Sequence, residues 1–436
     1  MEALTNPVLL SVLLLCVLAL LNVHVILALL IATLAAGLLS GRSVMETLEF
    51  LIAGLGNQGE TAIAYLLLGI LAVMVSRSGV TEKFVDRLLP WISGRRGATV
   101  FLLAGLACLS QNVVPVHIAF IPLLIPPLLA AFNRMKVDRR AVAAALTFGL
   151  KAPYLLVPLG FGLIFQGIVV RAMGEHGMEL EISQMPIAMA IPVAGMVVGL
   201  LFAVLISYRK DREYLTVEST FTQRSAGADE PWGYKHTVVV LALAVSLVLQ
   251  LVTESLVLAA LGGVLLMFLL RVETWKQGEK IVPEGVALMG TIAFVMLLAA
   301  GYANVLTETE SVAALVDQMG EWVGGSQLAA AVVMMVVGLV VTMGIGTSFG
   351  TVPVIAAIFV PLAASLGFSP LATAAMIGTA GALGDAGSPA SDSTLGPTSG
   401  LNADGQHSHI WDTCVPTFLH YNIPLFAGGV IAGLVL

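Results

Sequence analysis

Long apolar tracts separated by short polar segments run along the whole chain. Most tracts approach the ~20 residues that a helix needs to span hydrocarbon, and none alternates with the period of two that a membrane β-strand requires. The tracts 7–39 and 237–270 are too long for one helix across a ~30 Å hydrocarbon core. Polar residues interrupt both tracts, at 22–24 and at 253–255. The pattern therefore predicts two short helices from each tract.

The same pattern divides the chain into two halves, each with five crossings and one extra tract between the third and the fourth. The expected crossings are 7–22, 24–40, 61–77, 140–170 and 186–207, then 237–252, 255–270, 285–306, 370–400 and 411–434. Prolines and small polar residues punctuate the extra tracts, 98–132 and 327–366, which we interpret as re-entrant hairpins. The predicted domains are a first repeat over 1–208, a cytoplasmic linker over 209–235 and a second repeat over 236–436.

Three segments of the first half recur in the same order in the second, about 230 to 240 residues later. The paired strings are AYLLLGILAVMVSRSGVTEKFVD with AFVMLLAAGYANVLTETESVAALVD, SQNVVPV with SFGTVPV, and LTFGLKAPYLL with IGTAGALGDAGSPAS. Recurrence in order indicates a duplication, and an odd number of crossings in each half makes the repeat inverted. Many secondary transporters are built in this way.

The distribution of basic residues predicts the orientation. With both termini outside, the loops 77–97, 133–140, 208–236 and 271–283 face the cytoplasm and hold 17 of the 20 Lys and Arg residues. Short cytoplasmic loops are enriched in these residues. If each long tract were a single helix, the 271–283 loop would move to the other side of the membrane. The charges therefore favour the inverted arrangement with about 10 crossings.

Composition supports this reading, because 58% of the residues are hydrophobic and 11% are charged, against about 25% charged in soluble domains. The chain is therefore expected to be an all-α polytopic membrane protein. Its three cysteines are isolated and indicate no disulfide framework. The sequence contains no P-loop and no feature typical of nucleic-acid binding, so primary pumping and nucleic-acid partners are not expected.

Ionisable residues inside the apolar tracts are few, and they mark the expected chemistry. Lys151 lies in the fourth crossing of the first half, and Asp385 and Asp392 lie in the equivalent crossing of the second. Charges at membrane depth are costly and usually belong to a transport pathway. Prolines and glycines interrupt both crossings, so freed backbone carbonyls are expected to join Ser388, Ser393 and the two aspartates. Such an oxygen-rich site suits a coupling ion, with the aspartates as candidate Na⁺ ligands.

Lys151 has three open interpretations at this point. It could form a fixed salt bridge with an aspartate, balance the charge of the ion site, or meet a substrate carboxylate. The predicted hairpin tips supply the other wall of a substrate site, because small hydroxyl residues and glycine let backbone approach a ligand. The candidate substrate-binding residues are Lys151, Ser110, Gln111, Asn112, His117, Thr347, Ser348 and Thr351.

A second polar group follows the aspartates near the end of the chain. It consists of Asp404, His407, His409, Asp412 and His420, whose spacing loosely resembles that of metal ligands. We interpret it as a capping and polar network, since such residues at the end of a span most often hydrogen-bond to backbone.

The string GDAGSPASDST resembles the GD-x-x-SP-x-SD-[ST]-T motif of the sodium/proton antiporter family within the ion-transporter superfamily. SQNVVPVHIAFIPLLIPPLL, GLKAPYLLVP and the long string from 383 to 424 resemble more closely a bacterial subgroup described as histidine or amino-acid permeases. The resemblance implies an elevator-type fold with ion coupling, and Asp385, Ser388, Pro389, Asp392 and Ser393 match the motif. Many antiporter relatives have a lysine directly after the first aspartate, where this chain has Ala386.

These observations predict a secondary transporter and not an enzyme. The leading hypothesis is Na⁺- or H⁺-coupled uptake of a small amino acid, histidine first, across the bacterial cytoplasmic membrane, and the alternative is Na⁺/H⁺ antiport. No cofactor is expected besides the coupling ion, and a homodimer is possible through the first two crossings of each half. An intramembrane aspartyl protease is disfavoured because position 382 is Ala in the ALGD string, where that class has glycine.

Overall fold

The computed structural model describes residues 6–21, 23–80, 83, 96–112, 120–159, 161–215, 231–253, 255–311, 314, 323 and 325–436. Every regular element in this part of the chain is a helix, so the all-α expectation is confirmed. His117, Glu254 and the side chains of Gln111 and Asn112 lie outside what is described.

The helices of the first half follow the apolar tracts closely. They are α1 (Pro7–Leu20), α2 (Val25–Leu39), α3 (Val44–Leu55), α4 (Gly59–Arg77), α6 (Arg96–Asn112), α7 (Phe120–Arg134), α8 (Arg139–Leu156), α9 (Phe161–Glu175) and α10 (Met185–Phe202). A π-helical turn, Ala203–Ser207, extends α10.

The helices of the second half are α11 (Tyr234–Thr253), α12 (Leu256–Leu269), α13 (Gly278–Glu308), α16 (Gln327–Ile345), α17 (Ser348–Ser365), α18 (Pro370–Ala382) and α19 (Asp392–Leu401). A last helical stretch runs from His409 to Val435 and contains α20 (Val415–Thr417) and α21 (Ile423–Val435).

The two longest apolar tracts are each two helices, as their polar interruptions predict. α1 packs against α2, and α11 packs against α12, so the chain reverses direction at each break. His24 caps α2 by accepting a hydrogen bond from the amide of Ile26 at 3.4 Å. Ser255 caps α12 in the same way, because its side chain accepts from the amide of Leu258. Side-chain caps satisfy the free amides at a helix start.

Five helices of the described part are long and apolar enough to cross a membrane. The number rises to seven if α8 with α9 is one span and if α17, which is bent near its middle, is another. Five further apolar helices are shorter, 10–17 residues each. The predicted total of about 10 crossings depends on these shorter helices also crossing, so it stays a prediction, as do the domain boundaries and the inverted repeat.

α3 is a helix that the sequence analysis does not predict. Ser43 and Glu46 form a capping box at its start, with Ser43 accepting from the amide of Glu46 at 3.2 Å. α3 then packs against α2 and α13. The Ser-x-x-Glu spacing before an apolar run is a sequence signal for a helix start, and it could have identified this element.

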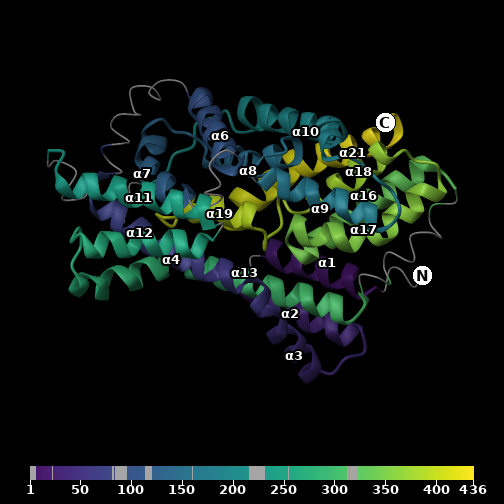
Figure 1. Ribbon diagram of the computed structural model, residues 1–436, viewed down its shortest axis with the longest axis horizontal. Coiled ribbons are helices and arrows are strands. Elements are labelled where there is room, and N and C mark those ends of the chain that lie inside the picture. The colour runs from purple at the N-terminus through teal and green to yellow at the C-terminus, as the bar shows by residue number, and fades with distance from the viewer. Residues whose placement is uncertain are drawn as a thin grey trace.

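The helices form two packed groups (Figure 1). In one, α4 and α13 lie side by side, with α2 and α3 against α13 and α12 against α4. In the other, α8 packs against α6 and α10, and α18 packs against α10, α16 and α21. α19 contacts α7, α8 and α13, so it lies where the two groups meet.

Two broken helix pairs cross in the second group. α8 and α9 are bent by 50° where Leu156 ends the first helix and Phe161 begins the second, and α18 and α19 are separated by the non-helical residues 383–391, most of which form turns. α8 packs against α19, and α9 packs against α18. The four helix ends therefore meet at one place, where Pro158 and the glycines of the second break interrupt the backbone hydrogen bonds.

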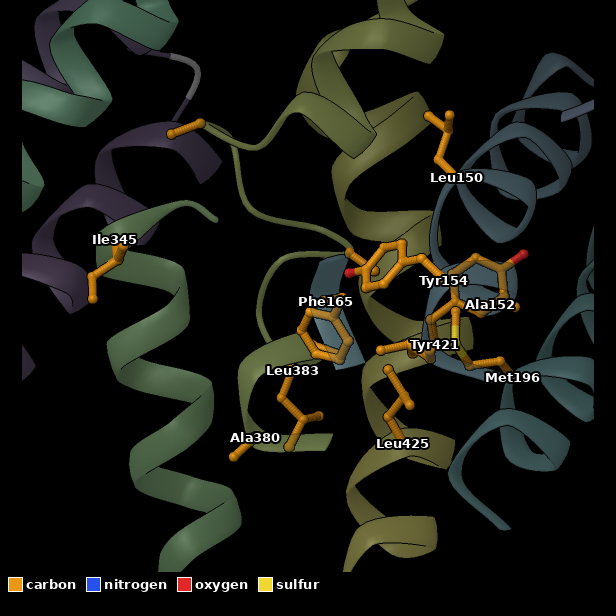
Figure 2. Packing of buried hydrophobic residues seen from close by; sticks show 14 of the residues in the cluster. Leu150, Ala152, Tyr154, Phe165, Met196, Ile345, Ala380, Leu383, Tyr421 and Leu425 are labelled. Carbon is orange, nitrogen blue, oxygen red and sulfur yellow. The ribbon is translucent and has the colours of Figure 1, made fainter. Parts of the chain in front are cut away.

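An aromatic cluster fills the core beside this crossing (Figure 2). The rings of Tyr154 and Phe165 meet edge to face with centroids 5.0 Å apart, and Phe349 of α17 lies 5.6 Å and 5.7 Å from them. Tyr154 and Phe165 are fully buried. Such aromatic pairs add about 0.5–1.5 kcal/mol each beyond burial, so they hold the tip of α17 against the break in α8.

Candidate ion and substrate site

At two positions of the break between α18 and α19, the backbone adopts a conformation that favours glycine. Gly384 and Gly387 have φ values of +82° and +117°, in the left-handed region that L side chains rarely adopt. A Cβ on Gly384 would meet the carbonyl oxygen of Leu339 at 2.5 Å, and one on Gly387 would meet backbone of Phe418 at 2.8 Å. The two glycines therefore let the break turn tightly between neighbouring helices.

Asn422 holds this turn from the last helical stretch. Its side chain accepts a hydrogen bond from the amide of Gly384 at 2.9 Å and donates one to the carbonyl of Ala386 at 2.6 Å. The unwound backbone is thereby satisfied at a depth where unpaired amides are costly. Asn422 is a residue that sequence reasoning missed, because nothing local to it predicts that it contacts residue 384.

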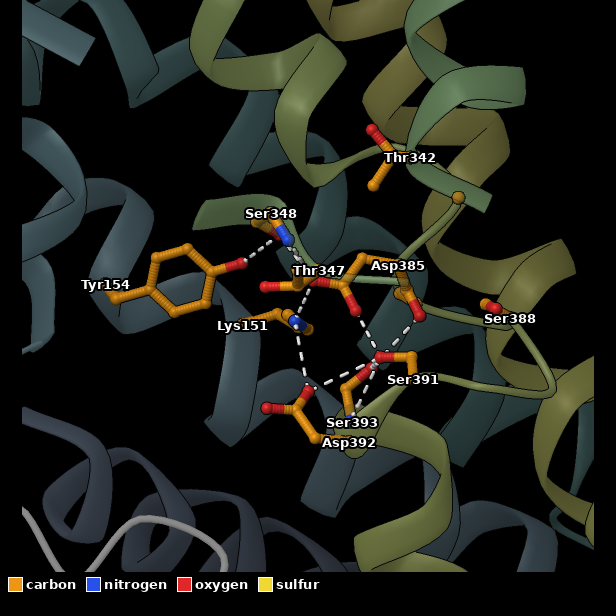
Figure 3. A network of polar contacts seen from close by, with 12 residues as sticks. Lys151, Tyr154, Thr342, Thr347, Ser348, Asp385, Ser388, Ser391, Asp392 and Ser393 are labelled. Carbon is orange, nitrogen blue, oxygen red and sulfur yellow. Dashed lines mark hydrogen bonds and ion pairs between the residues drawn. The ribbon is translucent and has the colours of Figure 1, made fainter. Parts of the chain in front are cut away.

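Lys151, Asp385 and Asp392 meet at the crossing (Figure 3). The ammonium of Lys151, on α8, forms a direct ion pair with Asp385 Oδ2 and lies 3.7 Å from Asp392 Oδ1. Asp385 belongs to the break, and Asp392 is the first residue of α19, where the helix dipole favours a carboxylate. The structure therefore brings together the three ionisable residues that the sequence singles out.

Hydroxyl groups complete the coordination of Asp385. Its Oδ2 accepts hydrogen bonds from the hydroxyl and, at 3.3 Å, the amide of Ser348, and its Oδ1 accepts one from Ser391 Oγ. Tyr154 extends the network, with its hydroxyl 2.8 Å from Ser348 Oγ. Both oxygens of Asp385 are thus engaged, and a cation that bound this carboxylate would have to displace Lys151.

Ser391 connects the two aspartates. Its Oγ donates toward Asp385 Oδ1 and also lies 3.4 Å from Asp392 Oδ1. A hydroxyl has one proton, so it can donate to only one carboxylate at a time. Ser393 lies behind it, with Oγ 2.9 Å from Ser391 Oγ and 3.1 Å from the carbonyl of Asp385. These hydroxyl and carbonyl oxygens are the donor type that Na⁺ prefers.

The three charged side chains differ in exposure. Lys151 and Asp385 are 5% and 1% exposed, whereas Asp392 is 28% exposed. Asp392 also lines a cavity of about 700 Å³, which we call the Glu60 cavity. The carboxylate of Asp392 is therefore the most exposed of the three charges, and the ammonium of Lys151 is buried.

The Glu60 cavity lies between the two groups of helices. α4 contributes Glu60 and Thr61, α13 contributes Asn304 and Thr307, and the α16–α17 tip contributes Gly346, Thr347, Phe349 and Gly350. The cavity therefore connects the end of the molecule where α4 begins and α13 ends with the broken helices.

A second cavity, of about 680 Å³, lies on the other side of the crossing. We call it the His24 cavity. It is lined by His24, by Glu284 of α13, by Thr398 of α19 and by His409. His409 Nε2 is 2.8 Å from the carbonyl of Pro389, in the break itself. The break is therefore flanked by one cavity toward each end of the molecule.

The predicted site residues divide into those in the network and those outside it. Ser348, Ser393, Lys151 and the two aspartates are in it, and Thr347 lines the Glu60 cavity. Ser388 accepts a hydrogen bond from the amide of Ala390 through its hydroxyl, and no dashed line joins it to a carboxylate in Figure 3. Thr351 donates to the carbonyl of Thr347, and Ser110 donates to that of Ala107. The hydroxyl groups of Ser388, Thr351 and Ser110 therefore hydrogen-bond to backbone groups a few residues away.

Residues 404–420 form hydrogen bonds and ion pairs of their own. Asp404 binds Arg139 through both oxygens, at 2.7 and 2.6 Å, and Asp412 binds Arg212 at 2.7 Å. His407 contacts Thr413, and His420 contacts Ser207. Each residue has a separate partner, as the interpretation of a polar network requires, and the described residues contain no cluster of metal-ligating side chains.

The Arg139–Asp404 pair is a further buried ion pair among the described residues, and the sequence analysis does not predict it. Both side chains are almost fully buried, at 0% and 1% exposure, and the guanidinium stacks 4.2 Å from the ring of Tyr214. Burial raises the pKa of Asp404, but the hydrogen bonds and charge of Arg139, together with Gln406, outweigh it and leave that pKa below its ordinary value. The pair joins the start of α8 to the loop after α19.

Sequence comparison places the chain in a family. The sequence pattern described as "Na+/H+ antiporter family" matches residues 145–434, and a second, described as "Na+-H+ antiporter family", matches residues 6–92. The chain belongs to the Na⁺/H⁺ antiporter family. It is a multi-pass membrane protein and a secondary transporter, and it is not an enzyme.

Two relatives match along most of their length. An uncharacterised membrane protein of Vibrio parahaemolyticus, VP2115, is 47% identical over 99% of this chain and 100% of its own length. A Bacillus subtilis protein named "Putative amino acid transporter YuiF" is 47% identical over 90% of this chain and 91% of its own. The YdaH transporter of Alcanivorax borkumensis is similar in structure, with a TM-score of 0.44, 17% identity and coverage of 98% of each chain. A similarity at that level does not define the fold.

Proposed function

We propose that the protein couples the uptake of a small amino acid, histidine first, to an inward flow of Na⁺ or H⁺. The observation that carries this proposal is the position of Asp392. It lies at the end of a cavity of about 700 Å³ and beside a closed Lys151–Asp385 pair. Ligand cavities are typically about 300–1,000 Å³, so this one has room for an amino acid together with an ion.

The lining of the Glu60 cavity supports an amino acid with a ring. Phe161 and Phe349 line it, and Phe349 is held by Tyr154 and Phe165. Aromatic faces pack well against a planar, partly apolar side chain such as imidazole. The name of the Bacillus relative adds support for amino-acid transport in general, and histidine is the first candidate because the sequence resembles that permease subgroup.

Each charged residue has a role in this proposal. Asp392 binds or exchanges the coupling ion, with Ser391 and Ser393 as the nearest hydroxyl ligands. Asp385 stays paired with Lys151 and holds the break closed through Ser348. Lys151 then balances the two carboxylates rather than meeting a substrate carboxylate, because it is 5% exposed.

Na⁺/H⁺ antiport is the second candidate, and one contact favours it. Lys151 lies against both aspartates, so a Na⁺ bound between them would compete with the ammonium for the same oxygens. Such competition could exchange the ion for a proton without any organic substrate. The family to which the chain belongs gives this candidate general support.

Reconstitution separates the two candidates. Purified protein in proteoliposomes is expected to accumulate labelled histidine under an inward Na⁺ or H⁺ gradient, with the other amino acids as competitors. A pH-sensitive dye inside the same vesicles measures proton movement driven by Na⁺ in the absence of amino acid. Proton movement without uptake would replace amino-acid symport with antiport.

Orientation and assembly are part of the proposal. We place both termini outside the bacterial cytoplasmic membrane, so that the Glu60 cavity opens outward and the His24 cavity opens inward. The short helix pairs α1–α2 and α11–α12 are the proposed contact surface of a homodimer, since they are apolar and expose large side chains such as Leu13, Leu27 and Leu258. Crosslinking of single cysteines on α12 in membranes would test the dimer.

A further inference from the structure

One wall of the Glu60 cavity contains a polar group that the proposal above leaves unused. Gln250, on α11, lines the cavity and is 8% exposed. Its Oε1 has no hydrogen-bond partner among the residues that the structure describes. Buried side-chain amides almost always have a partner, so an exception indicates a bound water, an ion or a ligand. At the wall of a cavity of this size, a ligand is the natural partner.

The charges of the cavity indicate which end of a ligand it receives. Its described lining includes two carboxylates, Glu60 and Asp392, and no Lys, Arg or His side chain. Glu60 accepts a hydrogen bond from Ser255 at 3.1 Å, at the start of α12. Lys151 would offset this negative charge, but it is 5% exposed whereas Asp392 is 28% exposed. In a medium of lowered dielectric, this imbalance attracts a positive group.

We propose, on the basis of the function inferred above, that this cavity recognises its cargo through the α-ammonium group. Glu60 and Asp392 together balance two positive charges, the cargo ammonium and the coupling ion that Asp392 binds, and the amide of Gln250 hydrogen-bonds the cargo from the α11 wall. The ammonium is therefore the group that the cavity selects. A molecule with the same ring and carboxylate but no ammonium is not taken.

Gln250→Leu tests the amide. Leucine fills a similar volume and cannot hydrogen-bond, so the variant is expected to raise the KM for histidine uptake about tenfold and to leave kcat nearly unchanged. Gln327→Leu is the matched control, because Gln327 begins α16, bonds the carbonyl of Leu366 at 2.9 Å and does not line the cavity. A wild-type KM in Gln250→Leu, or an equal rise in both variants, would overturn the assignment of Gln250.

The ligand supplies the complementary test. Histidine and 3-(imidazol-4-yl)propionate differ in the α-amino group alone, and both are added as competitors of labelled histidine. We expect unlabelled histidine to compete and the propionate to fail, with a smaller difference between the two in Gln250→Leu. Competition by the propionate at the same concentration as histidine would show that the ammonium is not the recognised group.

A third measurement does not depend on transport. Thr61, which lines the cavity, is replaced by cysteine in a background without the native Cys16, Cys108 and Cys414. The cationic reagent methanethiosulfonate ethylammonium is expected to modify it faster than the anionic ethylsulfonate. Faster modification by the anionic reagent would overturn the inference. Absence of amino-acid uptake together with a cationic preference would instead remove the proposed function alone.

Discussion

Two buried ion pairs join α8 to the segment around α19, and they differ in what surrounds them. Arg139 and Asp404 are 0% and 1% exposed, joined by two hydrogen bonds and covered by Tyr214. Lys151 and Asp385 are also buried, but their neighbour Asp392 reaches a cavity. Arginine fixes a carboxylate in a planar two-point contact, whereas lysine is a point charge on a flexible stem that can change partners. The first pair is suited to holding helices together, and the second is suited to exchange.

Replacing Arg139 is expected to cause the largest loss of stability. Arg139→Met leaves Asp404 buried without its partner, and breaking a buried pair in this way costs about 3–5 kcal/mol. We expect a large fall in the melting temperature of the detergent-purified protein. Arg140→Met is the matched control one residue away, because Arg140 is 36% exposed and its pair with Asp138 is expected to contribute less than about 1 kcal/mol. Equal falls in both would contradict the proposed difference.

Asp392→Asn tests the functional side. The variant keeps the shape of the side chain and removes the charge that faces the Glu60 cavity. We expect ion-coupled uptake to fall at least about a hundredfold, because an amide is a far weaker ligand for a cation than a carboxylate. The melting temperature should stay close to that of the wild type. Normal coupled uptake in this variant and in Asp385→Asn would remove the site assignment.

Lys151→Met separates a movable charge from a fixed salt bridge. Asp385 keeps its hydrogen bonds from Ser348 and Ser391, so we expect a loss of about 1–3 kcal/mol, smaller than for Arg139→Met. Uptake should persist with an altered dependence on the ion gradient. The measurement is uptake at several Na⁺ concentrations and pH values. A variant that does not fold at all would identify the pair as a fixed structural bridge.

Acid should weaken the Arg139 pair slightly. The pKa of Asp404 is lowered in the folded protein, so its contribution to stability is present above the ordinary Asp value of about 3.9. That contribution is lost as the pH falls through the lowered folded-state pKa. The melting temperature should therefore drop below about pH 4, and less steeply in Asp404→Asn than in the wild type. Identical pH profiles would show that Asp404 does not carry this dependence.

Local chemistry in the sequence was enough to find the broken helices and their charges. Gly384, Gly387 and Pro389 cannot continue a helix without cost, and Lys151, Asp385 and Asp392 stand out against an apolar background. The predicted duplication puts the crossing of Lys151 and the crossing of the two aspartates at equivalent positions of the two halves. These features depend on residues close in sequence or related by the repeat, so a single sequence carries them.

Contacts set by packing alone were not predictable. The sequence pattern groups Arg139 with the charges of the 133–140 loop, and its pairing with Asp404, 265 positions later, depends on how α8 meets α19. Gln250 lies in an apolar helix and gives no signal until the cavity is seen. The residue types of Ser388 and Thr351 suggest site residues, but their hydroxyls hydrogen-bond to nearby backbone. The direction in which a hydroxyl points depends on its rotamer, which the sequence pattern does not reveal.

The hydroxyl of Ser391 has a consequence for how events at one aspartate reach the other. It lies within reach of both carboxylates and has one proton to donate. In the proposed function, a cation bound at Asp392 would leave the Ser391 proton to Asp385 alone. The two carboxylates would then be coupled through the rotation of one O–H bond. Ser391→Ala would sever that link while leaving every charge of the site in place.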